Sequence, residues 1–444
     1  MLHPCAGALY KEDFVMNWIM DATAPVYQLL VSKGRDKLAE MYRQCFRSTW
    51  DTTLQRSDGS VFLITGDIPA MWLRDSSAQV YHYLPAARNF PEVRETILGL
   101  MRRQFQYIIL DPYANAFNRE ASGRHGYADR TSWTPEQEPW IWEQKYEIDS
   151  LCYPIRLTHA FWKQTGDVSW CTDQFRKAVD TILHVWETEQ HHAETSPYYF
   201  ERGNCPPSDT LENGGRGTPV AYTGMIWSGF RPSDDACRYG YLVPSNLFAA
   251  TSLEQIMEIA QTVMHDISLS ERAGTLLAKV REGIRKYAVV RHPVFGDVYA
   301  YETDGLGNHL FMDDANVPSL LSLPYLGCVP ADDPVYQNTR RMVLSQANPY
   351  YYEGTCARGI GSPHTPEDYI WPISLCVQGL TSDSAEEITA LADMLEHMDA
   401  GTMLMHEGVH KDDPAQFTRP WFAWANSIFS EFVEKAAPLL PDRA

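Results

Sequence analysis

The chain has 444 residues, of which 44% are apolar and 21% charged, the composition of a globular protein with a large core. Its 57 acidic and 37 basic residues give a net charge of −20, which opposes binding to nucleic acid or anionic lipid and favours neutral or cationic partners. The nine cysteines are scattered and odd in number, which indicates free thiols in a reducing compartment. With neither a leader nor an apolar run of about 18 residues, we expect a cytoplasmic protein that does not enter a membrane.

Helical periodicity is first evident at residues 38–50, where apolar residues recur on one face. The same pattern predicts further helices at 93–109, 146–162, 175–186, 242–263, 273–290, 336–344, 388–398 and 421–433, with weaker ones near residues 317 and 369. Short strands are predicted at 61–65, 198–201 and 298–301, too few and too scattered for a central sheet. We therefore expect about a dozen helices in one mainly α domain over residues 1–444.

Six connecting loops are rich in Gly, Pro, Trp and carboxylates, and each leads into a helix. They span residues 65–79, 130–150, 224–246, 309–319, 362–372 and 405–424. Six such loops among about twelve helices is the number expected if helical hairpins stack around an axis, because all six loops then open at one end of a barrel.

The first of these loops carries four residues suited to holding a sugar: Asp67, Trp72, Arg74 and Asp75. An indole covers the apolar face of a pyranose, and an Arg–Asp pair supplies directed hydrogen bonds to neighbouring hydroxyls. The alternative is a buried ion pair that ties the loop to a helix, with Trp72 in the core. We expect Ser76 or Ser77 to cap the following helix, leaving Arg74 and Asp75 at its N-terminal end.

Hydrolysis of a glycosidic bond requires two carboxyl groups, one protonated and one ionised. The candidates are Asp234 and Asp235, Asp313 and Asp314, and Glu407. Adjacent aspartates raise one another's pKa, but they also favour the N-terminus of a helix, and capping is the favoured interpretation for Asp313 and Asp314. Glu407 follows an apolar run and precedes a glycine, which suits a partly buried general base, although a structural glutamate fits as well.

Other chemistries have weaker support. The segment with His406, Glu407 and His410 does not have the H-E-x-x-H spacing and lacks the further ligand that a metal site needs. C-x-x-C pairs are also absent, so no metal is expected. Glycine motifs of nucleotide-binding proteins and the G-x-S-x-G motif are also absent. Tryptophans 133, 140 and 142 lie beside carboxylates in the second loop and fit sugar stacking, whereas at least one of Trp421 and Trp424 is expected in the core, since the two share a helical face.

Several loops resemble bacterial members of glycoside hydrolase family 125, which are exo-acting α-1,6-mannosidases. The matching segments are TGDIPAMWLRDSSAQ, WEQKYEIDSLCYP, WSGFRPSDDACRYGYLVPSN, FMDDANVPSLLSLPYLG, and MHE followed by TRPWFAWANSIFSE. They extend in the same order from about residue 10 to residue 435. The resemblance implies an (α/α)6 barrel, inversion at the anomeric carbon, no cofactor, and release of terminal mannose from neutral α-1,6-linked oligosaccharides such as N-glycan fragments.

The resemblance also implies that Asp234 is the general acid and Glu407 the general base. The residues alone leave Asp234 and Asp235 as alternatives for the acid. An inverting site must admit a water, so we expect the two carboxyl groups about 6.5 to 9.5 Å apart. The other residues expected at the sugar are Asp67, Trp72, Arg74, Asp75, Glu147, Asp149, Arg231, Asp235, His364, Arg419 and Trp421.

Three alternative functions remain. One is an inverting exo-glycosidase for another sugar, such as glucose, because a fold does not fix the sugar. A second is a non-catalytic sugar-binding protein, although such a protein has no need of both Asp234 and Glu407. The third is a helical scaffold for protein partners, which the polar loops disfavour, since such scaffolds bind across repeated helix surfaces.

Overall fold

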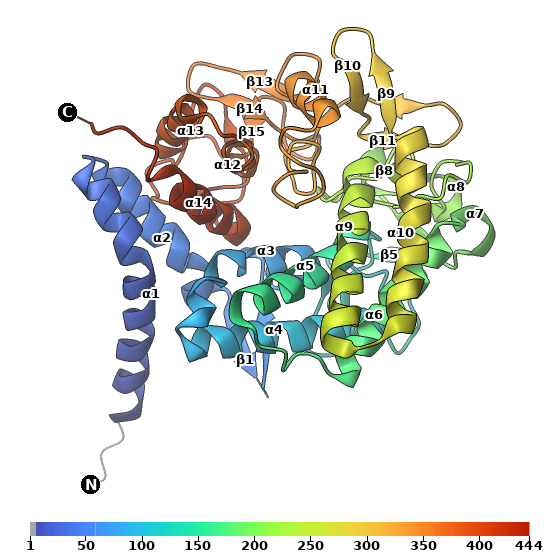
Figure 1. Ribbon diagram of the computed structural model, residues 1–444, viewed down its shortest axis with the longest axis horizontal. Helices are drawn as coiled ribbons and strands as arrows, with labels where there is room; N and C mark the ends of the chain where they lie inside the picture. The colour runs from blue at the N-terminus through green and yellow to red at the C-terminus, as the bar shows by residue number, and fades with distance from the viewer. Residues whose placement is uncertain (1–5, 58, 444) are drawn as a thin grey trace.

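The computed structural model describes residues 6–57 and 59–443, with side chains from residue 18 onward. The ends of the predicted 1–444 domain, residues 1–5 and 444, lie outside this range. The helices of the described chain (Figure 1) are α1 Ala6–Ser32, α2 Asp36–Thr52, α3 Leu73–Ala78, α4 Pro91–Leu110, α5 Ile148–Thr165, α6 Asp173–Glu189, α7 His192–Thr195, α8 Glu212–Gly215, α9 Val243–Ile259, α10 Ile267–Tyr287, α11 Pro334–Val343, α12 Pro372–Leu380, α13 Ala385–His397 and α14 Ala423–Ala436.

The strands are short and pair antiparallel in small, separate sheets of two or three. They are β1 Leu54–Ser57, β2 Ser60–Leu63, β3 Met71–Trp72, β4 Ala116–Phe117, β5 Asp129–Thr131, β6 Ile141–Glu143, β7 Phe200–Arg202, β8 Tyr241–Leu242, β9 Val289–His292, β10 Gly296–Tyr299, β11 Glu302–Thr303, β12 His309–Leu310, β13 Tyr351–Glu353, β14 Arg358–Ile360, β15 Tyr369–Ile370 and β16 Val409–His410. As expected, none of these sheets forms the centre of the described structure.

The helices alternate between an inner and an outer ring. The inner helices α3, α5, α9, α12 and α14 are buried over most of their surface, whereas α2, α6, α10, α11 and α13 each keep an exposed polar face. Helices that are apolar all round belong inside, and amphipathic helices belong outside. Neighbouring inner helices contact one another, as in α3 with α5, α5 with α9 and α12 with α14. The fold is mainly α, of the (α/α)6 barrel type.

The inner position between α10 and α11 is filled by turns at residues 319–328, where a helix near residue 317 was predicted. That prediction is wrong. Pro318 and Pro324 interrupt the backbone pattern, and the backbone N–H groups of Leu320 and Leu321 donate to the Asp313 carboxylate at 2.8 and 2.9 Å. The capping interpretation predicted that Asp313 accepts from free backbone N–H groups at the start of a helix. Asp313 does accept from such groups, but they belong to a turn.

Three other predictions need correction, and one helix, α1, was not predicted. Ser76 and Ser77 do not cap a helix; they lie inside α3, and both hydroxyls donate to the carbonyl of Leu73. The helix predicted at 273–290 ends at Tyr287, and residues 289–292 form β9. Residues 369–370 form β15, and the helix begins at Pro372.

The decorated loops meet at one end of the barrel because inner and outer helices alternate along the chain. Each inner helix is entered from one of these loops, so the N-terminal ends of α3, α5, α9, α12 and α14 all point to the same end of the barrel. The small sheets β3–β4–β6, β8–β11–β12 and β15–β16 hold the loops together at this end. The first and last barrel helices, α2 and α14, pack side by side and close the ring (Figure 1).

The buried apolar side chains form one large cluster that runs from Trp18 to Leu440, and a small one around Trp72. Cys5 lies outside the described residues, and the other eight cysteines are free thiols. Within the described range, we find no helix with the length and apolar character that crossing a bilayer demands.

Candidate active site

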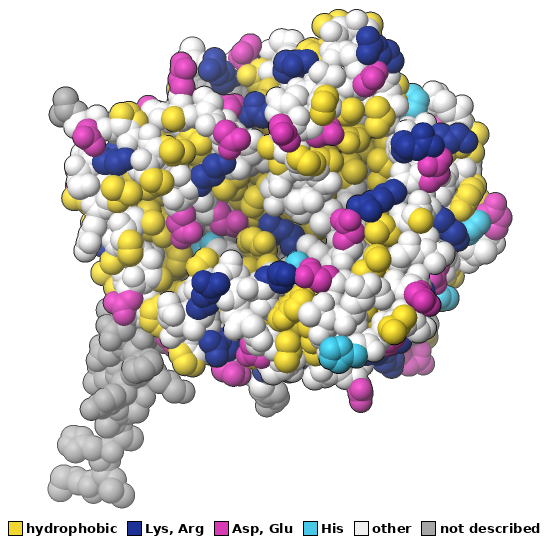
Figure 2. All heavy atoms as spheres, viewed as in Figure 1, with side chains coloured by type: hydrophobic (Ala, Val, Ile, Leu, Met, Phe, Trp, Pro, Cys, Tyr) yellow, Lys and Arg dark blue, Asp and Glu magenta, His cyan; other side chains and the backbone are white. Residues whose placement is uncertain are grey.

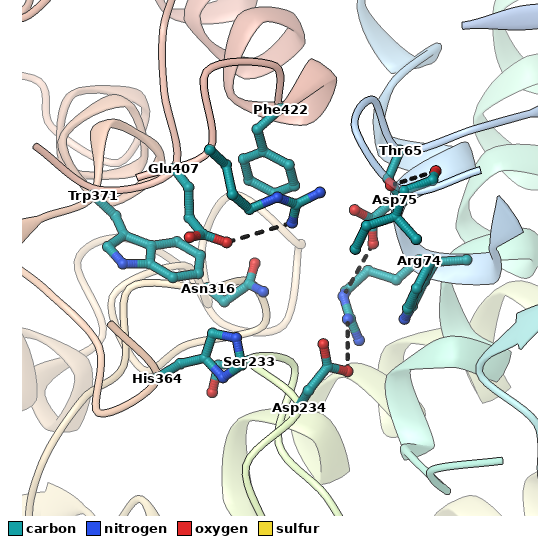
Figure 3. Close-up of a pocket in the computed structure, with 13 residues that line it drawn as sticks. Thr65, Arg74, Asp75, Ser233, Asp234, Asn316, His364, Trp371, Glu407 and Phe422 are labelled. Atoms are coloured by element: carbon teal, nitrogen blue, oxygen red, sulfur yellow. Dashed lines mark hydrogen bonds and ion pairs between the residues drawn. The ribbon is translucent and has the colours of Figure 1, made fainter. Parts of the chain in front are cut away.

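The pocket at the N-terminal end of the inner helices is lined by residues from five of the six decorated loops (Figure 3). The lining residues are Thr65, Ile68, Trp72, Arg74, Asp75, Ser233, Asp234, Asn316, His364, Trp371, Glu407, Arg419 and Phe422. A wider cleft of about 610 Å³ adjoins it and shares Ile68, Trp72, Asp234 and His364. The remaining decorated loop, residues 130–150, contributes Trp142, Glu143 and Lys145 to this cleft, so residues from all six loops meet here, as predicted.

A second cleft lies among the C-terminal ends of α5, α12 and α14, at the opposite end of the barrel. Its lining includes His159, Lys163, Glu431 and Glu434 but none of the decorated loops. Figure 2 shows one face of the molecule hollowed near its middle, with charged and histidine side chains around the hollow. The first pocket differs from the second cleft in being lined by the decorated loops, which carry the predicted site residues.

Arg74, in the first turn of α3, is the electrostatic centre of the first pocket. Its guanidinium, 2% exposed, lies 2.5 Å from Glu147 and 3.2 Å from Asp149. It also lies 3.6 Å from Asp75 and 3.9 Å from Asp234. The carboxyl groups of Glu147 and Asp149 are fully buried beneath Arg74 and are absent from the pocket lining. These two residues were predicted to hold the sugar, but the structure places them where they hold the arginine.

Asp234 projects into the pocket from a tight turn. Its backbone φ is 69°, a left-handed conformation that is costly for a residue with a side chain and is concentrated at functional sites. The turn is closed by hydrogen bonds from the Arg231 N–H to Asp235 O at 2.8 Å and from the Asp234 N–H to Arg231 O at 2.9 Å. Asp235 instead lines the adjoining cleft, with its carboxylate 3.9 Å from His364 Nδ1.

The charges around Asp234 favour its ionised form. Burial disfavours that form, but Lys145, Arg74 and His364 together lower the pKa of Asp234 below its usual value. Lys145 Nζ donates to the backbone carbonyl of Asp234 at 2.7 Å, and Asn115 Nδ2 donates to its carboxylate at 3.4 Å.

Glu407 lies on the other side of the pocket from Asp234, in the loop before α14 (Figure 3). Its side chain is 7% exposed and is 3.4 Å from Arg419 Nη1. Arg419, whose φ of 45° is also left-handed, donates from Nε to the two Asp67 oxygens at 3.0 and 3.2 Å. Asp67 thus holds Arg419 against Glu407, although Asp67 itself is outside the lining.

His364 adds a positive charge to the pocket wall. Burial opposes that charge, but the proximity of Asp235, Asp234 and Glu407 raises the pKa of His364 to about 9. The side chain is therefore an imidazolium at neutral pH. A cation near Asp234 and Glu407 limits the mutual repulsion of these two carboxylates.

Two other predicted site residues lie outside the pocket lining. Arg231 forms a buried ion pair with Glu302 at 2.6 Å, and Trp421 Nε1 donates to Thr52 Oγ1 at 3.2 Å. Trp424 is in the core, as expected from its helical face. Prediction missed Trp371 and Phe422, which form aromatic walls (Figure 3). Both lie near the end of a decorated loop, immediately before an inner helix, which is the signal that could have identified them.

Two buried polar atoms, one in the pocket and one in the adjoining cleft, are free to meet a ligand. Among the described residues, neither Trp72 Nε1 nor Asp235 Oδ2 has a hydrogen-bond partner. A buried polar atom without a partner is costly, so such atoms at a pocket indicate polar ligand groups. Within residues 6–57 and 59–443, no group of three or more His, Cys, Asp or Glu side chains is arranged to hold a metal ion.

Comparison with known proteins reveals related sequences and structures. A family model described as metal-independent alpha-mannosidase (GH125) matches residues 35–434. The meiotically up-regulated gene 157 protein of Schizosaccharomyces pombe is 42% identical over 419 residues, which cover 90% of this chain and 82% of that protein.

Two solved structures illustrate the range of similarity. A metal-independent α-mannosidase of Streptococcus pneumoniae, in a non-productive complex with α-1,6-mannobiose, has a TM-score of 0.92 at 45% identity, covering 95% of this chain and 98% of that one. A bacterial glucoamylase has a TM-score of 0.56 at 13% identity, covering 90% and 56%, which indicates a shared fold alone. The family match spans most of the chain, including every loop that lines the pocket. The chain belongs to the GH125 family of metal-independent α-mannosidases, which are glycoside hydrolases.

Proposed function

We propose that this protein is an inverting exo-α-1,6-mannosidase that removes terminal mannose from neutral manno-oligosaccharides or N-glycan fragments. The observation that carries the proposal is the pair Asp234 and Glu407, which face each other across the pocket (Figure 3). The α-1,6-mannobiose bound by the Streptococcus pneumoniae relative supports the choice of linkage.

The two carboxyl groups would divide the chemistry. Asp234 borders both the pocket and the adjoining cleft, so it is placed to protonate the oxygen between a sugar in the pocket and a leaving group in the cleft. Glu407, as base, would take a proton from the water that attacks the anomeric carbon from the opposite face. The expected carboxyl separation of about 6.5 to 9.5 Å remains part of this proposal.

The remaining lining residues would hold the terminal sugar. Trp72 offers an unpaired Nε1 donor, and Trp371 and Phe422 offer apolar faces for the C–H side of a pyranose. Arg74 and Asp75 supply a donor and an acceptor at the end of α3. Exo action is supported by the arrangement of a small pocket beside a wider cleft, in which a terminal sugar enters first and the rest of the chain stays outside.

Our proposal extends to the domain organisation, the cofactor requirement and the compartment. We propose that the whole chain acts as one catalytic domain, which the continuous apolar cluster from Trp18 to Leu440 supports. We also propose that it needs no cofactor and works in the cytoplasm. The eight free thiols are in keeping with a reducing compartment.

The test is hydrolysis of α-1,6-mannobiose beside its α-1,2 and α-1,3 isomers, with proton NMR of the first sugar released. We expect β-mannose from the 1,6 isomer. Asp234→Asn and Glu407→Gln should each lower kcat/KM by roughly 10²–10⁴-fold, because each removes one acid–base group. Asp235→Asn, a change of the same kind on the neighbouring residue, should lower it much less.

Other outcomes would contradict the proposal. Nascent α-mannose would exclude inversion, and preference for another isomer would exclude the linkage. Equal activity of Asp234→Asn and wild type would exclude Asp234 as the acid. Hydrolysis of glucosides in place of mannosides, or binding without turnover, would favour one of the two alternatives given above, another exo-glycosidase or a sugar-binding protein.

A further inference from the structure

The carboxyl groups around Arg74 outnumber the cations that face them. Four carboxyl groups, from Asp75, Glu147, Asp149 and Asp234, lie within 4 Å of its guanidinium, at 2.5 to 3.9 Å. The other cations near the cluster are Lys145, His364 and Arg419, but Lys145 is also paired with Asp209, and Arg419 with Asp67 and Glu407. Buried carboxylates this close cannot all ionise, so the cluster retains a proton.

The hydrogen bonds indicate which oxygen holds that proton. Glu147 Oε2 accepts from Arg74 at 2.5 Å and from the Ser150 hydroxyl at 2.8 Å. Glu147 Oε1 is buried and has no donor among the described residues. In Asp149, by contrast, both oxygens accept, from Ser245 at 3.2 Å and from Arg74 at 3.2 Å. An ionised oxygen without a donor is costly, so Glu147 Oε1 is the favoured site of the proton.

A proton on Glu147 Oε1 needs an acceptor, and Asp234 is a neighbouring carboxylate at the same guanidinium: Arg74 lies 2.5 Å from Glu147 and 3.9 Å from Asp234. We propose that Glu147 is a positioning residue that stores the proton used by Asp234: in the resting protein it donates a hydrogen bond to the Asp234 carboxylate, and it passes the proton to Asp234 once substrate is bound. This inference rests on the proposed function.

The ionisation of the two groups is consistent with this assignment. Burial is the largest cause that raises the pKa of Glu147 well above its usual value; Arg74 opposes this shift, and repulsion from Asp149 and Asp234 adds to it. The pKa of Asp234 is lowered, as described above. At rest, the proton is therefore on Glu147, which does not contact the sugar, and Asp234, which does, is a carboxylate.

The proton balance closes over one turnover. The proton moves from Glu147 to Asp234 and then to the glycosidic oxygen as the bond from that oxygen to the anomeric carbon breaks. Water forms the new bond to that carbon and loses a proton to Glu407. Glu147 and Asp234 are then both ionised beside Arg74, and they regain one proton from solvent while Glu407 releases one.

The test is the pH profile of kcat/KM for Glu147→Gln. Glutamine can still donate a hydrogen bond to Asp234 but cannot give up a proton, so Asp234 must titrate alone. We expect the basic limb for α-1,6-mannobiose to move to lower pH by about one unit or more, with most activity retained at acidic pH. With 2,4-dinitrophenyl α-mannoside, whose leaving group needs no proton, the loss should be small.

Asp149→Asn is the matched control, because it also removes a carboxylate from Arg74, one whose two oxygens accept from Arg74 and Ser245. Asp149→Asn should lower kcat/KM by a similar factor at every pH and with both substrates. The pH of the basic limb should not change. The same behaviour in Glu147→Gln would overturn the proposal and leave Glu147 with a purely structural role. An inactive wild type would instead contradict the proposed function, so the two failures are distinguishable.

A second measurement avoids any change at Glu147. Infrared difference spectra of wild type and Asp234→Asn should reveal a protonated carboxyl band that shifts when its acceptor becomes an amide. A band that stays in place would overturn the proposal even if Glu147→Gln did not fold.

Discussion

Asp234 and Asp235 are neighbours in the chain, but their surroundings differ. The left-handed turn at Asp234 places this residue at the border of the pocket and the adjoining cleft, whereas Asp235 lines the cleft beside His364 and is absent from the pocket lining. Composition and spacing could not separate the two residues, because their difference lies in the backbone of a single turn. The assignment of Asp234 as the acid from family resemblance agrees with this placement and awaits the kinetic test.

His364 gives the folded protein a pH-dependent part of its stability. Its pKa is raised to about 9, whereas histidine in an unfolded chain titrates near about 6.5. The folded state therefore binds the proton more tightly, and this stabilisation is complete below about pH 6.5 and is lost as the pH rises through about 9. Because 39% of the side chain is exposed, solvent screens the interaction and the effect should be modest.

Thermal unfolding measured across this pH range checks the prediction. We expect the Tm of wild type to fall from pH 6.5 to 9 more steeply than that of His364→Asn, which cannot carry the charge. Asp235→Asn, which keeps the histidine but removes its partner, should give an intermediate slope. Parallel curves for all three proteins would contradict the assignment.

At the scale of elements, the first and last decorated loops are joined at Gly66. The Asp67 N–H donates to the carbonyl of Trp421 at 3.1 Å, and a Cβ on Gly66 would lie 2.2 Å from that oxygen. The φ of Gly66 is 137°, a conformation that other residues rarely adopt. This contact requires glycine for both reasons, and it positions Asp67 for its ion pair with Arg419.

We expect Gly66→Ala to lower the free energy of unfolding by about 2–4 kcal/mol, because the clash separates two loops that pack tightly. Activity should fall as well, since Arg419 would lose its support next to Glu407. Gly203→Ala is the control: a Cβ there meets nothing within 4 Å, and the change should stay within about 0.5 kcal/mol. Chemical denaturation measures both, and equal stabilities would contradict the prediction.

Elements with strong periodicity were predicted well, and those set by tertiary contacts were not. The helices at α2, α4, α5, α6, α9, α11, α13 and α14 are confirmed, because each has an apolar stripe long enough to reveal its period. The six-residue helix α3 is buried on all sides and has no stripe, so its start at Leu73 could not be located. The burial of Glu147 and Asp149 beneath Arg74 depends on the pairing of α3 with α5, which local sequence does not encode.

At the scale of the whole molecule, a partly buried ion-pair network joins the start of the barrel to its end. Arg35, 2% exposed, precedes α2 and pairs with Asp393 and Glu396 of α13. Arg443, beyond α14, contacts the same two carboxylates at 2.6 and 2.7 Å. Removing Arg35 would leave buried Glu396 with less compensation, far in sequence from the loops of the pocket.

We expect Arg35→Met to lower the free energy of unfolding by about 3 kcal/mol without a change in kcat/KM at 25 °C. The control is Arg285→Met, an exposed arginine paired with Glu282 three residues earlier, for which no measurable change is expected. Equilibrium unfolding and initial rates on the same samples test both parts. Loss of activity in folded Arg35→Met would contradict the separation of this network from the pocket.

The contact between Asp67 and Arg419 joins residues 352 positions apart in the sequence and holds Arg419 in the lining of the pocket. During translation, Arg74 and Asp75 leave the ribosome long before Glu407 and Arg419 are made. Contacts of such long range also form late in folding. We therefore expect nascent chains to be inactive until α14 has emerged and docked against α2, so that catalysis reports the completion of the entire chain.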